Sequence, residues 1–151
     1  MKAQLLADTA LQSFDINKTT HHAAPIVGFS NYYATTSGYI VSTKNESPII
    51  LVGRCTNGYL KVSLLGKEHR VHRLVASTFF EKPDEDRFET LRDQVNHIDG
   101  NRQNNAVSNL EWCSAKENHE HLWQVLQAKD VLQAAILKNR QQGRSSHEQA
   151  R

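Results

Sequence analysis

The sequence has little cysteine. Its 151 residues include only Cys55 and Cys113, and no CxxC pair occurs anywhere. A structural zinc site built on four cysteines, or on a cysteine pair with a histidine pair, needs such close spacing. We therefore expect no structural zinc, and we interpret both cysteines as small buried apolar residues.

Long hydrophobic runs are also missing. No apolar stretch approaches the ~20 residues that span a membrane. The segment from Met1 to Phe14 has neither the continuous apolar centre nor the cleavage site of a secretion signal. We expect a cytoplasmic protein without a membrane partner. The chain length allows one compact domain with a helical extension.

Strong net charge is absent, since the formal value is only +2, but the charges are unevenly distributed. Between residues 54 and 73, Glu68 is the single acid among five cations, which are Arg54, Lys61, Lys67, Arg70 and Arg73. A basic stretch of this kind favours a surface that faces a polyanion, with an ordinary solvated surface as the alternative.

Short strands with turn signals begin near residue 25. Asn57-Gly58 between two alternating runs predicts a tight hairpin, because both central residues of its turn need positive φ. In the second run, Tyr59, Lys61 and Ser63 share one face, which could meet a ligand. The predicted strands are 32–35 and 39–43 around Ser37-Gly38, and 49–55 and 59–65 around Asn57-Gly58.

Helical spacing occurs in two later segments. Apolar residues predict a helix over 72–80. Ser114 and Glu117 form a capping box that predicts the start of a long helix, and Gly143 is its expected end. Before residue 25 we expect only a short helix and a polar linker over 17–22. The acidic segment 81–93 is expected to be a surface loop.

These elements predict an α+β fold. A small antiparallel β-hairpin region precedes a ββα unit and a long C-terminal helix. We expect four parts: an extension over 1–24, a β-rich module over 25–66, a core with the ββα unit over 67–126, and a helical tail over 127–151.

The segment 95–121 combines groups that phosphodiester hydrolysis needs. It is predicted to form a strand that ends at His97, a loop rich in Asn and Gly, a returning strand, and a capped helix with Asn118 in its first turn. A histidine can accept a proton from water near neutral pH. The amide oxygens of Asn96 and Asn118 can hold a divalent cation that neutralises phosphate charge.

This segment resembles the HNH homing-endonuclease family of the ββα-metal type, which is common in phages. The shared residues are VNHIDGN from 95, the NN at 104–105, NLEW from 109, and Asn118 with His121. VHRLVA at 71–76 looks like the family's lead-in, and residues 27–42 resemble the N-terminal module often fused to it. The resemblance covers most of residues 25–122, and it implies that 25–66 is a DNA-binding module and 67–126 the HNH nuclease core.

The resemblance implies a role for each matching residue. His97 would be the general base, and Asn109 would fix the loop and the orientation of that histidine. Asn118 would be a metal ligand, with His121 as the alternative. Asn96 stands where the family often has Asp, and a neutral amide binds a hard cation more weakly than a carboxylate does. Such a site either relies on DNA phosphate oxygens, or has low activity, or has decayed.

The resemblance also implies partners. The cofactor would be Mg²⁺, with Mn²⁺ as an alternative, and the substrate would be double-stranded DNA in the cytoplasm of a host if a phage encodes the chain. The long helix could join two copies in a homodimer. The alternative functions are a DNA-binding protein without catalysis and a toxin-like nuclease. The candidate DNA contacts are Arg54, Lys61, Lys67, Arg70, His72, Arg73, Arg102 and Lys116.

Overall fold

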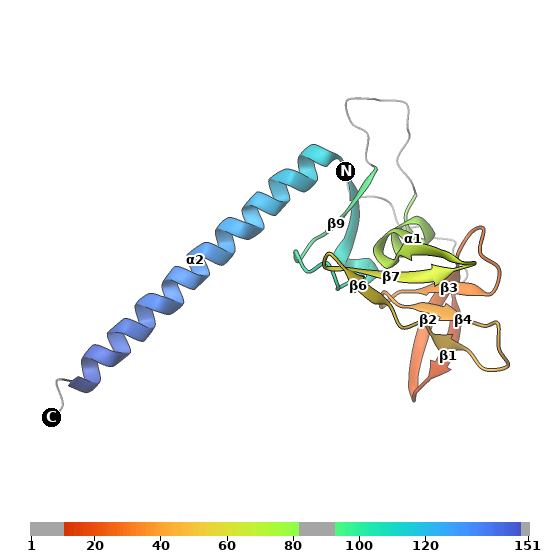
Figure 1. Ribbon diagram of the computed structural model, residues 1–151, viewed down its shortest axis with the longest axis horizontal. Coiled ribbons are helices and arrows are strands. Elements are labelled where there is room, and N and C mark those ends of the chain that lie inside the picture. The colour runs from red at the N-terminus through yellow and green to blue at the C-terminus, as the bar shows by residue number, and fades with distance from the viewer. Residues whose placement is uncertain (1–10, 82–92, 149–151) are drawn as a thin grey trace. The chain divides into compact units, whose positions relative to one another are not determined.

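The computed structural model describes residues 11–81 and 93–148, with side chains up to residue 137 in the last helix. It has two compact parts, one up to Ala115 and one from Lys116 onward. The strands are β1 Gln12–Ile16, β2 Thr19–Pro25, β3 Tyr32–Thr35, β4 Ile40–Ser42, β5 Ile49–Ile50, β6 Arg54–Thr56, β7 Tyr59–Leu64, β8 Lys67–Arg70, β9 Gln94–His97 and β10 Leu110–Cys113. The helices are α1 Val71–Phe79, the 3₁₀ turn η2 Val107–Asn109, and α2 Ala115–Glu148. The predicted α+β class is confirmed (Figure 1).

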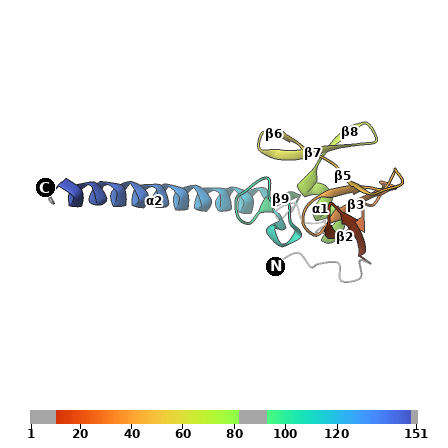
Figure 2. The same cartoon turned by 90° about the horizontal axis from the view of Figure 1, so that it is seen from below.

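Three antiparallel sheets make up the first part. The first contains β1 to β5 in sequence order, the second β6 to β8, and the third β9 and β10. Helix α1 packs against β2, β3, β7, β8, β9 and β10 and so joins all three sheets. Figure 2 shows the β6–β8 sheet and the strands β2, β3 and β5 as separate layers. The apolar core therefore forms around α1, where Val75 and Ala76 are fully buried.

The segment before residue 25 differs from the sequence expectation. The short helix and the polar linker are wrong for the described residues, because Phe14 lies in β1 and residues 19–22 begin β2. Asn17 and Lys18 both have positive φ, which makes the turn of this hairpin. The strand β2 then pairs with β3, so the hairpin is continuous with the first sheet. Leu5 and Leu6, also expected in the short helix, lie outside the described residues.

The second sheet confirms the Asn57-Gly58 hairpin. Both residues have positive φ, and β6 pairs with β7 on either side of them. Val62 and Leu64 are buried against the core, whereas Ser63 is exposed on the opposite face. The alternation expected along β7 is thus confirmed. Cys55, expected to be buried, is exposed, while Cys113 is buried.

The second part is the helix α2. It starts directly after Ser114, as the capping box predicts, and runs to Glu148. The expected end at Gly143 is wrong, because one glycine costs a long helix only about 1 kcal/mol and is tolerated within it. In the described part of the chain, no helix is long and apolar enough to cross a membrane. Most of the acidic segment 81–93 lies outside the described residues.

Candidate active site

The strands β9 and β10 place His97 at the end of a short antiparallel ladder. His97 faces Leu110 across the ladder, and Asn96 faces Glu111. Since side chains alternate along a strand, His97 and Asn96 point to opposite faces. Both are buried, with 5% and 6% of their surface exposed. The predicted strand end at His97 and the returning strand from Leu110 are confirmed.

The Asn-rich loop between these strands is organised around Asp99. Its carboxylate accepts hydrogen bonds from the Asn101 backbone and from the side-chain amides of Asn104 and Asn109, at 2.7–2.9 Å. Asn109 also donates to the Asn104 carbonyl and accepts from the Asp99 backbone. Although the loss of some surrounding water raises the pKa of the Asp99 carboxyl, the hydrogen bonds from Asn104, Asn101 and Asn109 lower it overall. Asn109 therefore holds the loop itself.

The hydrogen bond to His97 comes from Asn105. Its Oδ1 lies 3.0 Å from Nε2 of His97, and its Nδ2 donates to the Gln103 carbonyl. Because Oδ1 can only accept, Nε2 of His97 carries the proton and Nδ1 is the basic nitrogen. Asn105 is 3% exposed. Sequence reasoning missed this residue, although its place in the NN pair, eight positions after His97, was a usable signal.

Two further rings surround His97. His72, from the start of α1, lies with its ring centroid 5.1 Å away, and that of Tyr59 lies 6.2 Å away. His72, which was predicted to contact phosphate, is buried, with only 3% of it exposed. Tyr59 was expected only as part of a polar strand face. It reaches the histidines because the tight turn at Gly58 brings the end of the hairpin to the Asn-rich loop, where Gly58 lies close to Arg102.

Burial decides the protonation of both histidines. It lowers the pKa of His97 below the usual range, against the opposing effects of the Asn105 hydrogen bond and the Asp99 charge. Burial, helped by the charges of His97, Arg70 and Arg73, lowers the pKa of His72 to about 3. Both imidazoles are therefore neutral at pH 7, and a neutral imidazole can accept a proton.

Most of the predicted DNA-contacting cations lie on the surface. Arg70 and Arg102 are exposed, and their guanidinium groups lie 5.3 and 4.9 Å from the ring centroid of Tyr59. The exposed Arg73 packs over Trp112 and donates to the Asp93 carbonyl. Lys67 and Lys116 are exposed as well.

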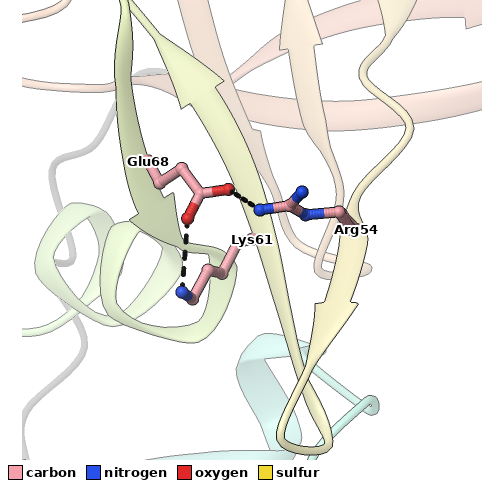
Figure 3. A network of polar contacts seen from close by, with 3 residues as sticks. All are labelled: Arg54, Lys61 and Glu68. Atoms are coloured by element: carbon pink, nitrogen blue, oxygen red, sulfur yellow. Dashed lines mark hydrogen bonds and ion pairs between the residues drawn. The ribbon is translucent and has the colours of Figure 1, made fainter.

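Arg54 and Lys61 share the one acid of the basic stretch. Both contact the carboxylate of Glu68, Lys61 at 3.3 Å (Figure 3). The hydrogen bond from Lys61 and the charge of Arg54 lower the pKa of Glu68. These two cations are thus partly neutralised, whereas Arg70 and Arg102 stack on an aromatic ring.

Asn118 and His121 lie one turn apart near the start of α2, and both are half-buried. Leu122 is 42% exposed. The less exposed side of the helix instead follows Asn118, His121 and Val125. This spacing of three and four residues keeps Asn118 and His121 on a common face.

The donor atoms suit a hard cation. Within the described ranges, no three His, Cys, Asp or Glu side chains gather as a ligand cluster. Oxygen atoms that could bind a metal are nevertheless present on the Asn96 face of the ladder. They belong to the Asn96 amide and the Glu111 carboxylate, which are joined by a hydrogen bond from Asn96 Nδ2 to Glu111 Oε1 at 2.9 Å. Amide and carboxylate oxygens are the ligands that Mg²⁺ and Mn²⁺ prefer. The residues present therefore fit a divalent metal of this kind.

Comparison with known proteins identifies the segment that carries this site. Residues 92–120 match the HNH endonuclease family. The chain carries an HNH segment. The match begins before β9 and ends in the first turns of α2, so it includes Asn96, His97, Asn105, Asn109 and Asn118. The resemblance on which the sequence interpretation rested is confirmed.

Several proteins share more of the chain than the HNH segment alone. The uncharacterized HNH endonuclease L245 of Acanthamoeba polyphaga mimivirus is 36% identical over 109 residues, which is 70% of this chain and 31% of that protein. YosQ of Bacillus subtilis, from the SPbeta prophage and named as an HNH homing endonuclease, is 36% identical over 98 residues, 62% of this chain and 53% of YosQ.

The DNA endonuclease I-HmuI of Bacillus phage SP01 is 39% identical over 69 residues, 43% of this chain and 36% of that enzyme. The chain spans about a third of the length of the mimivirus relative. No solved structure is significantly similar to this chain.

Proposed function

We propose that this chain is a metal-dependent endonuclease that hydrolyses phosphodiester bonds in DNA, with His97 as the general base. The observation that supports this most strongly is the hydrogen bond from His97 Nε2 to Asn105 Oδ1, within the HNH segment. It fixes one tautomer and assigns Nδ1 as the proton acceptor. Burial keeps the imidazole neutral at pH 7, so it is able to accept a proton.

Several residues of this chain would each have a distinct role in the reaction. Asn105 orients His97, while Asn109 and Asp99 hold the loop from which Asn105 projects. A divalent cation, when bound, would neutralise charge on the phosphate and on the leaving oxygen. Its ligands would be Asn96 and Asn118, with His121 as the alternative to Asn118.

DNA would be held by the exposed cations around the histidines. Arg70 and Arg102 flank Tyr59, which contacts the rings of His72 and His97. We propose that these two arginines bind phosphates next to the bond that is cut. Arg73, Lys67 and Lys116 would extend the contact, and Arg54 and Lys61 would contribute less because Glu68 neutralises them in part. Such contacts position the duplex without reading its sequence.

A plasmid-cleavage assay with Mg²⁺ or Mn²⁺ tests the function. We expect nicked or linear product with the unmodified protein and a loss of about 100-fold or more for His97→Ala, since a general base contributes about 10²–10⁴-fold. His22→Ala, which removes an exposed histidine of β2, serves as the control and should cleave normally. Equal cleavage by the protein and His97→Ala would refute the catalytic role.

The alternative is a DNA-binding protein without catalysis. The neutral amide at position 96 favours it, because the family often has a carboxylate there. Binding of duplex DNA with no cleavage at any Mg²⁺ or Mn²⁺ concentration would establish this alternative.

We also propose that cutting both strands requires two copies of the chain, because the HNH segment provides one set of site residues. A homodimer is therefore expected on DNA. Light scattering of the protein with and without duplex DNA measures this, and a monomeric mass in both conditions would contradict it.

A further inference from the structure

The carboxylate of Glu111 lies beside Asn96, a proposed metal ligand that has an amide in place of a carboxylate. Glu111 stands directly opposite Asn96 in the β9–β10 ladder, so both side chains project from the same face. Asn96 is 6% exposed, and its Nδ2 donates to Glu111 Oε1 at 2.9 Å. The next pair of the ladder, His97 and Leu110, projects from the opposite face.

The proposed ligands carry no negative charge of their own. Asn96, Asn118 and His121 are all neutral donors, and the affinity of an oxygen site for a divalent cation depends on how many charged ligands it has. Asp99 is the other acid close to His97 in sequence, but both of its carboxylate oxygens accept hydrogen bonds within the loop. Glu111 is the acid that adjoins Asn96.

We infer that Glu111 is a metal ligand of this chain and supplies the carboxylate that position 96 lacks. Two oxygens bound to one Mg²⁺ at about 2.1 Å lie at most about 4.2 Å apart, and these side chains are already in hydrogen-bond contact. The end of an Asn side chain rotates between two broad orientations. Rotation of the Asn96 amide places Oδ1 where Nδ2 is, so that two oxygens face one cation. The inference rests on the proposed metal-dependent function.

Calorimetric titration of the 151-residue chain with MnCl₂ tests the inference directly. We expect Glu111→Gln to weaken Mn²⁺ binding about tenfold or more, because it removes the charge and keeps the shape. Glu46→Gln removes the same charge from the exposed loop between β4 and β5 and should bind Mn²⁺ like the unmodified protein.

Moving the carboxylate from position 111 to position 96 tests whether Glu111 binds the metal or only supports the structure. The double variant Asn96→Asp with Glu111→Gln returns one carboxylate to the pair and should bind Mn²⁺ within a few-fold of the unmodified protein. Asn96→Asp alone places two carboxylates side by side. Without metal it should therefore have a lower Tm than the unmodified protein, and Mn²⁺ should raise its Tm by more.

The possible failures are distinguishable. If Glu111→Gln folds and binds Mn²⁺ as tightly as the unmodified protein, the inference is wrong, whether or not the protein cleaves DNA. If the unmodified protein binds no Mn²⁺, the inference is also wrong. If Mn²⁺ binding depends on Glu111 but the unmodified protein cuts no DNA, the metal site stands and the proposed nuclease function fails.

Discussion

Asn105 links the Asn-rich loop to the imidazole of His97. Its Oδ1 accepts from Nε2, which fixes the ring without adding a charge beside it. A carboxylate at the same place would instead stabilise the imidazolium form and raise the pKa of His97. Beside this amide, burial still keeps the pKa of His97 below its usual value and the base neutral. The role of Asn105 can therefore be tested by the pH dependence of cleavage.

We expect cleavage by the unmodified protein to lose rate only below about pH 6.5, because the pKa of His97 lies below that usual value. Asn105→Asp should shift this loss of rate to higher pH. Asn105→Ala should instead lower the rate about tenfold or more at every pH, since the ring loses its orientation. Rates of plasmid nicking between pH 5 and 8 measure both effects, and an unchanged profile for Asn105→Asp would contradict the role.

His72 makes the fold sensitive to acid. Its pKa is about 3 in the folded protein and about 6.5 in an unfolded chain, so between these values the unfolded state binds more protons. The contribution that the neutral His72 makes to the free energy of unfolding is therefore fully present above pH 6.5 and is lost as the pH falls toward 3. Each pH unit in this window costs at most about 1.4 kcal/mol.

We expect His72→Gln to reduce this acid sensitivity, although it also lowers stability at pH 7.5 by disturbing the packing with Tyr59 and His97. Urea unfolding at pH 7.5 and pH 5 measures the difference for each protein. Equal losses of stability in the unmodified protein and in His72→Gln would show that another group titrates.

At the scale of elements, the cations of the β6–β8 sheet differ in their contacts, because some are paired with Glu68 and one stacks on Tyr59. Arg54, Lys61 and Arg70 stand in one row across the three strands, since Lys61 pairs with both of its neighbours. Figure 3 shows Glu68 contacting Arg54 and Lys61, which leaves Arg70 to stack on Tyr59. The row therefore ends at the site with a cation that Glu68 does not neutralise.

We expect Arg70→Gln and Arg102→Gln each to weaken binding of duplex DNA and to reduce the slope of log K against log salt by about 1. Arg54→Gln is the matched control and should change the slope less, because Glu68 already neutralises part of its charge. Fluorescence anisotropy in EDTA, with salt varied between roughly 50 and 200 mM, measures these slopes. Equal effects of all three substitutions would contradict the distinction.

At the scale of the whole first part, the N-terminal sheet supports the HNH segment. The turn between β3 and β4 lies against the Asn-rich loop, where Val107 N donates to the Thr36 carbonyl at 3.0 Å. A Cβ on Gly38 would lie 2.3 Å from the carbonyl carbon of Asn105. The backbone that carries Asn105 is therefore held by a turn almost 70 residues earlier in the sequence.

We expect Gly38→Ala to lower stability by about 1–3 kcal/mol, because the new methyl group has no room. It should also lower the rate of cleavage, since it displaces Asn105. Gly28→Ala is the matched control, because Gly28 has nearly the same positive φ but no atom within 4 Å of the added Cβ. Unfolding curves and cleavage rates of both variants measure this, and equal effects would contradict the support proposed for Asn105.

The sequence determined the features that depend on local interactions. Asn57-Gly58 specifies its turn by positive φ, Ser114 marks the start of α2, and the alternation along β7 specifies its buried face. The strand that ends at His97 followed from the motif itself. Gly143 shows the limit of such signals, because a glycine ends a helix only where the next residues also leave the helical conformation.

Only the tertiary structure decided which side chains surround His97. His72 and Tyr59 come from α1 and the start of β7, and no local pattern indicates that they meet His97. The same holds for Glu111, whose place beside Asn96 depends on the register of β9 and β10. Periodicity specifies the face of an element, but contacts between elements depend on how their buried faces pack together.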